Sequence, residues 1–526
     1  MLALVVVVVL GAAMLASGAL AVRLRLAPPV LLLGCGVLLG FVPALREVHL
    51  PPETVLLLFL PALLYWESLT TSLREIRRDL RGIILMGTVL VVLTAGAVAA
   101  TAHALGLPWG PAWVLGAALA PTDATAVGVL ARRLPRRNVT LLRAESLIND
   151  GTALVIYALA VGITVGEQQL TTVHVSWLLL LAYGGGALAG LITAWAGVRL
   201  RRRLNDPMLG NVAMLIIPFT AFLLAEVIEA SGVVAVVICG LVMSQAGPRA
   251  VNAETRSQAV AFWSLATFML NGALFVLVGI EVQAAVRGLN SVDLFRGTVA
   301  VAVVAVVMFA ARLAFLFVSA YTIRGLDRRP QQRLRRISHR ARMVSAIAGF
   351  RGAVSLAAAL AVPATLASGQ PFPGRDTIVF VTAGVIVVTL VVQAPLLPVI
   401  VRWARLPHDV SVEKERRLAE TTAIREALAE LPALAAVLGT DPQVTDALRR
   451  EYDRHLEMLM SQDPASDGST LRHHDDAALR RALVAHKRAT VLRLRDQGHI
   501  DDTVLRRVQA RLDIEDLRLS DHDLVE

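Results

Sequence analysis

The chain has 526 residues, of which 56% are hydrophobic and 17% are charged, and its mean hydropathy is +0.63. This composition lies well outside the range of soluble globular domains and argues against a soluble enzyme of this size. Residues 1–407 carry 33 basic and 17 acidic side chains, whereas residues 408–526 carry 18 and 24. We therefore predict a transmembrane domain over 1–407 and a charged, soluble region over 408–526. The net charge of +10 reflects membrane topology and gives no reason to expect nucleic-acid binding.

Apolar stretches of about 20 residues, the length that crosses a bilayer as a helix, recur along the first part of the chain. Thirteen such candidates precede Pro407, and the short pair around Glu229 could instead form one re-entrant unit. The sequence therefore predicts an all-α polytopic membrane protein with about 13 transmembrane helices. The candidates lie near residues 2–22, 28–45, 52–70, 82–104, 109–131, 143–166, 173–198, 208–228, 230–247, 258–284, 295–322, 342–366 and 376–401.

Arginines alternate between the predicted loops. Six alternate loops hold 25 arginines, and the intervening loops hold four. By the positive-inside rule, this distribution predicts a protein of the cell membrane with its N-terminus outside and its C-terminal region in the cytoplasm. It also supports an odd number of spans. The run from Arg328 to Arg342 could also contact anionic lipids. The six basic loops cover residues 23–25, 74–81, 132–143, 199–203, 249–256 and 324–342.

Acidic residues inside the predicted spans are rare, and each is a candidate functional residue because a charge in a bilayer is costly. Glu67 ends the third span, and Asp123 interrupts the fifth directly after Pro121 and Thr122. Proline removes a backbone donor and frees a carbonyl, so this composition is typical of a discontinuous helix with extra hydroxyl oxygens. The alternative is that Asp123 only accepts hydrogen bonds at the helix break.

Four polar residues of the sixth span have the spacing of one helix face: Glu145, Ser146, Asn149 and Asp150. Carboxylate, hydroxyl and amide oxygens in this density suit a hard monovalent cation. A carboxyl group in a low-dielectric site also binds a proton more readily than it does in water. One carboxylate that holds either a cation or a proton, but not both, is sufficient for exchange.

Two arginines, Arg312 and Arg351, lie within the eleventh and twelfth spans. One alternative to ion binding is that Asp150 pairs with one of them, although two acids on one helix exceed what a single structural pair needs. Pro363 follows Arg351 in the same span, which predicts a second interrupted helix. If the first six and last six spans are inverted repeats, the breaks in spans five and twelve correspond and indicate a midplane substrate site. Asp123 would then offset the positive helix ends there, and Arg351 the negative ones.

Four motifs, taken in order, resemble those of the sodium/proton exchanger family, the first family of monovalent cation:proton antiporters, in the bacterial type with a soluble C-terminal tail. Each motif alone is weak, but their order and their placement in the spans make the joint resemblance strong. It covers the membrane domain, about residues 1–405. The motifs are Phe-Leu-Pro-Ala-Leu-Leu-Tyr-Trp-Glu at 59–67, Pro-Thr-Asp at 121–123, Glu-Ser-Leu-Ile-Asn-Asp at 145–150 and Gly-Phe-Arg-Gly-Ala at 349–353.

The resemblance implies a role for each matched residue. Asp150 would bind both the transported cation and the proton. Asn149 would support the geometry of the site. Glu145 would pair with Arg312, and Arg351 would stabilise the helix break. The family fold also implies a core domain that moves against a dimerisation domain in a homodimer. The remaining oxygen ligands of the ion would come from Glu67, Asp123, Ser146 and the backbone carbonyl of Thr122.

The neutral side chain of Asn149 predicts electroneutral exchange. Homologous electrogenic antiporters have a second aspartate at this position, so the amide removes one titrating group. One carboxylate that exchanges one cation for one proton moves no net charge. We therefore predict a secondary antiporter that exchanges Na⁺ or Li⁺ for H⁺ by alternating access and needs no resident cofactor. Potassium/proton exchange by the same fold is the alternative, because both ions prefer oxygen ligands.

Two other classes of function fit less well. An intramembrane enzyme would use Asp123 and Asp150 as a catalytic pair, but no protease or transferase motif accompanies these acids. A passive channel would show flux without coupled proton movement. Arg351 near the ion path and a single titrating site favour alternating access over a channel.

The region after Pro407 has the apolar spacing of helices near residues 413–431, 444–460, 475–497 and 501–519, with a polar break at 461–470. His473 and His474 precede two aspartates, an arrangement that could bind a metal ion. A solvated helix start with aspartates in its first turn is the simpler interpretation. Regulation of transport by this region is a hypothesis.

Overall fold

All regular secondary structure in the ranges that the computed structural model describes is helical, apart from an isolated bridge between Thr365 and Pro371. The chain divides into two compact units, Met1–Asp409 and Val410–Glu526. The described ranges are 2–24, 28–42, 52–123, 136–166, 177–204, 206–250, 253–287, 291–326, 338–406 and 411–461, together with a few separate positions between 483 and 512.

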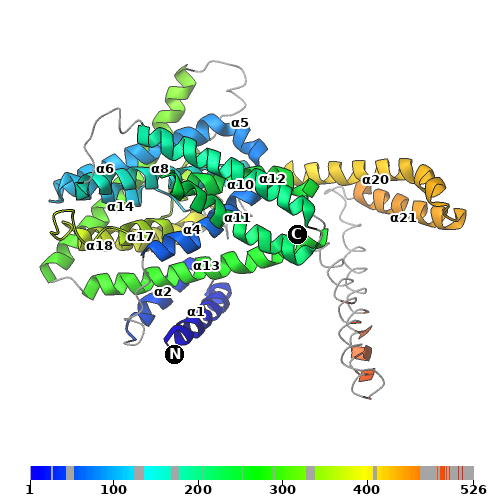
Figure 1. The fold of residues 1–526 in the computed structure, drawn as a ribbon, viewed down its shortest axis with the longest axis horizontal. Helices are drawn as coiled ribbons and strands as arrows, with labels where there is room; N and C mark the ends of the chain where they lie inside the picture. The colour runs from blue at the N-terminus through cyan, green and yellow to red at the C-terminus, as the bar shows by residue number, and fades with distance from the viewer. Residues whose placement is uncertain are drawn as a thin grey trace. The chain divides into compact units, whose positions relative to one another are not determined.

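The first unit is built from α-helices (Figure 1). Within its described residues, three helical runs contain a π-helical turn. The helices are α1 (Leu2–Leu24), α2 (Pro28–Leu39), α4 (Pro52–Thr70), α5 (Leu73–Ile84), α6 (Leu90–Ala104), α7 (Trp109–Leu119), α8 (Arg136–Val165), α10 (Gly186–Arg203), α11 (Pro207–Val227), α12 (Gly232–Ala250), α13 (Ala253–Arg287), α14 (Ser291–Leu326), α16 (His339–Ile347), α17 (Ala353–Leu360), α18 (Arg375–Val388) and α19 (Ala394–Ala404). The π-helical turns are η1 (Leu85–Val89), η4 (Leu181–Gly185) and η5 (Thr389–Gln393).

Each of the thirteen intervals predicted as a span contains helix. Within the described residues, seven helices are long and apolar enough to cross a membrane, and shorter apolar helices occur in α1, α2, α4 and α12. The pair around Glu229 forms two separate helices, α11 and α12, which pack against each other beside α10 (Figure 1). Glu229 lies in the turn between them with a φ of 54°.

The basic segment 74–81, predicted as a loop, is helical instead. It forms most of α5, which begins after Ser72, whose hydroxyl accepts a hydrogen bond from the backbone N–H of Glu75 (3.4 Å). Ile76 and Ile83 are buried while the arginines of α5 are exposed, so the segment has the amphipathic pattern of a surface helix. Through η1 it joins α6 in one helical run, and the serine cap explains why helix begins before the apolar stretch.

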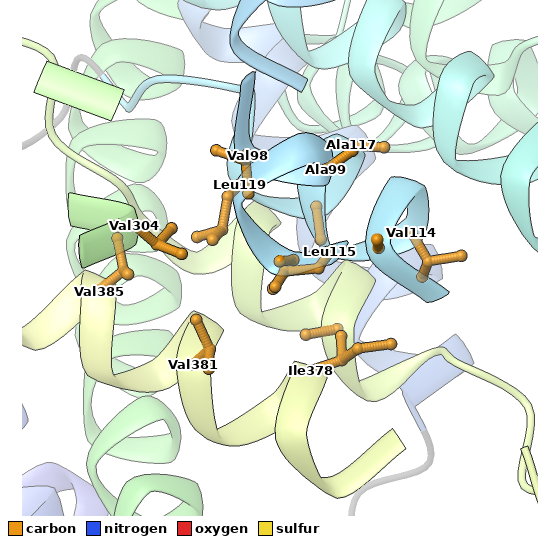
Figure 2. Packing of buried hydrophobic residues seen from close by; sticks show 14 of the residues in the cluster. Val98, Ala99, Val114, Leu115, Ala117, Leu119, Val304, Ile378, Val381 and Val385 are labelled. Atoms are coloured by element: carbon orange, nitrogen blue, oxygen red, sulfur yellow. The ribbon is translucent and has the colours of Figure 1, made fainter. Parts of the chain in front are cut away.

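Apolar packing holds α7, the helix that ends just before the break at Pro121, against its neighbours. Side chains from α6, α7, α14 and α18 interlock in one buried cluster (Figure 2). Because lipid is as apolar as these side chains, van der Waals packing rather than water exclusion holds the helices together. The cluster includes Val98, Leu115, Leu119, Val304, Ile378 and Val381, each at most 1% exposed.

A second buried cluster joins α4, α10, α11, α12 and α13. The long helix α13 also crosses α2 at very short range. A Cβ on Gly36 would lie 2.1 Å from the carbonyl oxygen of Val276, and one on Gly279 would lie 2.3 Å from that of Leu33. Only glycine permits this approach of two backbones, so the crossing of α2 and α13 is fixed by sequence.

The second unit contains two described helices that pack against each other, α20 (Ser411–Leu438) and α21 (Pro442–Ser461). The helix predicted to end at residue 431 continues through Pro432 and stops before Gly439, which has a φ of 63°. A proline forfeits a single helical hydrogen bond, and the alanine-rich and leucine-rich residues after it favour helix strongly enough to continue. The helices predicted after residue 470 lie largely outside the described residues, as do His473 and His474.

Candidate functional site

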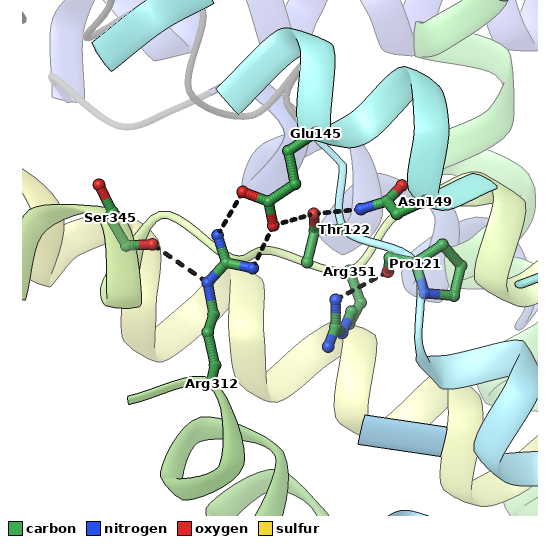
Figure 3. A network of polar contacts seen from close by, with 7 residues as sticks. All are labelled: Pro121, Thr122, Glu145, Asn149, Arg312, Ser345 and Arg351. Atoms are coloured by element: carbon green, nitrogen blue, oxygen red, sulfur yellow. Dashed lines mark hydrogen bonds and ion pairs between the residues drawn. The ribbon is translucent and has the colours of Figure 1, made fainter. Parts of the chain in front are cut away.

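Two interrupted segments meet within the first unit. The first follows α7, where Pro121 has no backbone N–H with which to extend the helix, and the second separates α16 from α17. The backbone N–H of Asp123 donates a hydrogen bond to the carbonyl oxygen of Phe350 (2.9 Å). The guanidinium of Arg351 donates one to the carbonyl oxygen of Pro121 (2.8 Å) (Figure 3). Each helix break therefore supplies a hydrogen-bond partner for a backbone group that the other break leaves unpaired. Such pairing is required within a membrane, where no water is available to bond these groups.

The carboxylate of Asp123 lies against the first turn of α17. A Cβ on Gly352, the N-cap residue of α17, would lie 1.8 Å from Oδ2 of Asp123. The positive end of the α17 dipole stabilises a carboxylate at this place, and the Arg351 guanidinium lies at the carbonyl end of the other break. The negative charge of Asp123 thus lies at a positive helix end and the positive charge of Arg351 at a negative one, and each offsets the partial charge there.

Glu145 of α8 and Arg312 of α14 form a buried ion pair. The two guanidinium nitrogens of Arg312 lie 2.5 and 3.1 Å from the carboxylate oxygens of Glu145, and both side chains are at most 4% exposed. Arg312 also donates through Nε to the carbonyl oxygen of Ser345 in α16 (3.1 Å; Figure 3). The pair that the family resemblance implies is present, and it ties α8, α14 and α16 together.

The hydroxyl of Thr122 belongs to this same network. It accepts a hydrogen bond from Nδ2 of Asn149 (2.7 Å) and donates one to Glu145 (3.4 Å; Figure 3). Because the hydroxyl is engaged in this network, the backbone carbonyl is the more available oxygen of Thr122 for an ion. The hydroxyl of Thr125, two residues after Asp123 in the sequence, lies outside the described residues.

A cavity of about 220 Å³ lies on the other side of α8. Glu67 of α4, Asp123 of the first break, and Ser146 and Asp150 of α8 line it together with Thr122. Its volume holds several water molecules, so a monovalent cation can enter with part of its hydration shell. Asn149 does not line this cavity. The four polar residues of α8 therefore divide into Ser146 and Asp150 facing the cavity, and Glu145 and Asn149 facing the hydrogen-bond network.

Asp150 is buried, at 5% exposure, and within the described ranges no hydrogen bond or ion pair engages its carboxylate. Glu67 and Asp123, and Arg351 with the opposite charge, lie within electrostatic reach of it. Three carboxyl groups lie near two arginines, Arg143 in the cavity lining and Arg351 at the second break, so one negative charge is left over and the site favours a bound cation or a bound proton. The pairing of Asp150 with Arg312 is wrong, because Glu145 occupies that guanidinium. Arg351 lies within electrostatic reach of Asp150, but among the described residues the two form no ion pair.

Comparison with known proteins identifies the family. Residues 7–403 match the family described as "Sodium/hydrogen exchanger, transmembrane". The chain belongs to the sodium/hydrogen exchanger family. A Na⁺/H⁺ exchanger of Mycobacterium tuberculosis, described as uncharacterized, is 45% identical over 98% of this chain and 96% of its own. A sodium, potassium, lithium and rubidium/H⁺ antiporter of Bacillus subtilis is 27% identical over 92% of this chain and 73% of its own.

The fold also matches that of a sodium/proton antiporter. The structure of MjNhaP1 from Methanocaldococcus jannaschii aligns with a TM-score of 0.58 at 20% identity, covering 76% of this chain and 99% of that one. Membership of the sodium/hydrogen exchanger family makes this protein a membrane cation/proton antiporter, a transporter rather than an enzyme, and the structural match supports its fold. Its all-helical architecture, expected from the sequence, is confirmed within the described residues.

The cavity of the exchanger is also lined by polar residues that the sequence analysis did not single out: Thr70, Arg143, Thr267, Asn271 and Ser355. Asn271 is an amide in the middle of a predicted span, and that alone could have marked it. Arg143 precedes Ser146 and Asp150 by three and seven residues, the spacing of one helix face, but it was counted with the basic loops. No sequence pattern marks Ser355 as a cavity residue, because its position depends on where α17 begins.

We expect Gly352→Ala to impair exchange strongly. The added methyl would overlap the Asp123 carboxylate, so the carboxylate or the start of α17 must move. Misplacement of a functional group by about 1 Å can reduce turnover by about 100-fold. The measurement is the cation-driven proton flux of purified protein in proteoliposomes. Gly82→Ala is the matched control, because no atom lies within 4 Å of the position of its Cβ; equal fluxes for the two variants would contradict the expectation.

Proposed function

We propose that this exchanger moves one Na⁺ or Li⁺ against one proton in each cycle, by alternating access of Asp150 to the two sides of the membrane. The observation that carries the proposal is the cavity in which Asp150, Asp123 and Glu67 converge with oxygen donors of Ser146 and Thr122. Hard monovalent cations prefer such a set of oxygens. A proton competes for the same carboxylate, and this competition couples the two ions without a resident cofactor.

The position of Asn149 supports this one-for-one stoichiometry. Its amide cannot titrate, and it donates to the Thr122 hydroxyl instead of facing the cavity. We infer that Asp150, the cavity carboxyl group next to Asn149 in α8, is the one that loses its proton when a cation binds and regains it when the cation leaves. One positive charge replaces another at the same site, so the cycle is electroneutral and driven by the two concentration gradients.

The experiment is cation-induced proton movement in proteoliposomes that contain an interior-acid dye. Addition of NaCl or LiCl should dequench the dye, and concentration jumps on vesicles adsorbed to a solid-supported membrane should give no sustained net current. The current measurement distinguishes one-for-one exchange from any stoichiometry that moves net charge, because only exchange that moves net charge is driven by the membrane potential. A sustained sodium-dependent current would contradict electroneutrality, and cation flux without proton movement would indicate a channel.

Potassium/proton exchange is the second candidate function. The relative from Bacillus subtilis is named for sodium, potassium, lithium and rubidium, and the oxygen ligands of this cavity suit each of these ions. The same dye assay with KCl separates the candidates. Dequenching by KCl alone would select potassium, whereas responses to NaCl and LiCl support the first proposal.

The proposed assembly completes this function. Residues 1–407 would cross the plasma or inner membrane as about 13 helices in two inverted repeats, with the N-terminus outside and residues 408–526 in the cytoplasm. The helices found in all thirteen predicted intervals, the meeting of two interrupted segments and the alternation of arginines support this arrangement. A homodimer in contact with membrane lipids is the assembly that the family resemblance implies.

A further inference from the structure

Ser355 is a buried hydroxyl to which the exchange mechanism above assigns no role. It is 1% exposed, and its Oγ has no hydrogen-bond partner among the described residues. It also lines the cavity that contains Asp123 and Asp150. Burying a hydroxyl that makes no hydrogen bond is unfavourable, so we expect the hydroxyl of Ser355 to bind a ligand in the cavity.

The position of Ser355 in its helix explains why the hydroxyl is available. Helical serines and threonines in this protein commonly donate to the carbonyl four residues earlier, as Ser68 does to Leu64 (2.6 Å) and Thr152 to Ile148 (3.1 Å). Ser355 is the third residue of α17, and the residue four before it is Arg351, within the break. The helix therefore offers Ser355 no carbonyl of this kind, and its oxygen remains free to face the cavity.

The hydroxyl and the Asp123 carboxylate lie at the same end of α17. Gly352 contacts Asp123, and Ser355 lies three residues further along, on the same helix face as Gly352. All three residues line one cavity. A cation near this helix end meets the unfavourable positive end of the dipole, which the carboxylate and a neutral oxygen at the same place would offset.

We propose that Oγ of Ser355 is an additional ligand of the transported cation, directly or through one water molecule. Both interrupted segments would then supply oxygens to the ion: Thr122 and Asp123 from the first, and Ser355 from the second. This inference rests on the proposed function, because it concerns the same site. A neutral oxygen contributes to affinity and to the choice among Li⁺, Na⁺ and K⁺ without taking part in proton exchange.

The test compares Ser355→Ala and Ser355→Cys with the wild type in proteoliposomes, and in a binding assay that follows cation-dependent thermal stabilisation. Cysteine keeps the size of serine but replaces a hard oxygen by sulfur, a poor ligand for these ions. Both variants should raise the half-saturating concentrations of Na⁺ and Li⁺ by about fivefold, the effect of one lost neutral interaction. The ratio between the two ions should change, while the maximal rate stays within about twofold.

Ser68→Ala is the matched control. Ser68 is as buried as Ser355, but its hydroxyl is satisfied within α4 and does not line the cavity. Its half-saturating concentrations should equal those of the wild type. Unchanged affinity and selectivity in Ser355→Ala, or wild-type values in Ser355→Cys, would overturn the inference and leave the proposed function intact. A wild-type protein that responds to no cation would overturn both.

Discussion

Replacing Asp150 by asparagine should abolish cation-induced proton release and leave the fold intact. The two side chains have almost the same size, and within the described residues no hydrogen bond or ion pair of Asp150 would be broken. Asparagine cannot hold a proton that a cation displaces, so coupling is lost even if a cation still enters the cavity. We expect the dequenching rate to fall by at least about 100-fold, the scale on which a lost acid–base group acts.

The measurement is the dye assay with NaCl and LiCl, paired with size-exclusion chromatography to establish that the variant folds. Asp376→Asn is the matched control: Asp376 is an exposed acid in the first turn of α18, away from the cavity. Its flux should equal that of the wild type. Retained exchange in Asp150→Asn would show that another group titrates, and Glu67 and Asp123 are the carboxyl groups left in the cavity.

The sequence predicts the positions of the helices better than their partners. Runs of about 20 apolar residues locate the spans, because a bilayer leaves few alternatives for such segments. Pro121 likewise marks the first interruption, since proline cannot continue the hydrogen bonds of α7. By contrast, segment 74–81 forms a helix because of the cap at Ser72 and the burial of Ile76, two local effects that charge counting overlooks.

The candidate site is only half visible in the sequence. Spacing places Ser146 and Asp150 together, but it does not say that Asn149 faces Thr122 instead of the cavity. The residues of one helix face point over a wide range of directions. Which groups each of them meets depends on other helices that are distant in the sequence. Family resemblance, and not spacing, identifies Arg312 as the ion pair partner of Glu145, because spacing alone assigns Arg312 equally well to Asp150. Tertiary packing makes this choice, and no local pattern records it.

Breaking the ion pair between Glu145 and Arg312 should lower the thermal stability of the exchanger severely. Glu145→Gln leaves the guanidinium of Arg312 buried at 4% exposure without its counter-charge, and it weakens a network that joins α8, α14 and α16. Removing one partner of a buried pair costs about 3–5 kcal/mol, because the remaining charge stays desolvated. We expect a large fall in the melting temperature in detergent, measured by fluorescence size-exclusion chromatography after heating.

The double variant Glu145→Gln/Arg312→Gln separates the charge effect from simple loss of packing. If the unpaired guanidinium is the main cost, removing it should make the double variant more stable than Glu145→Gln alone, which is a non-additive result. Arg416→Gln is the control, because Arg416 lies 3.8 Å from Glu420 in an exposed pair, and such pairs contribute about 0–1 kcal/mol. Additive losses in the double variant would mean that the pair acts through shape rather than charge, and would contradict this account of the network.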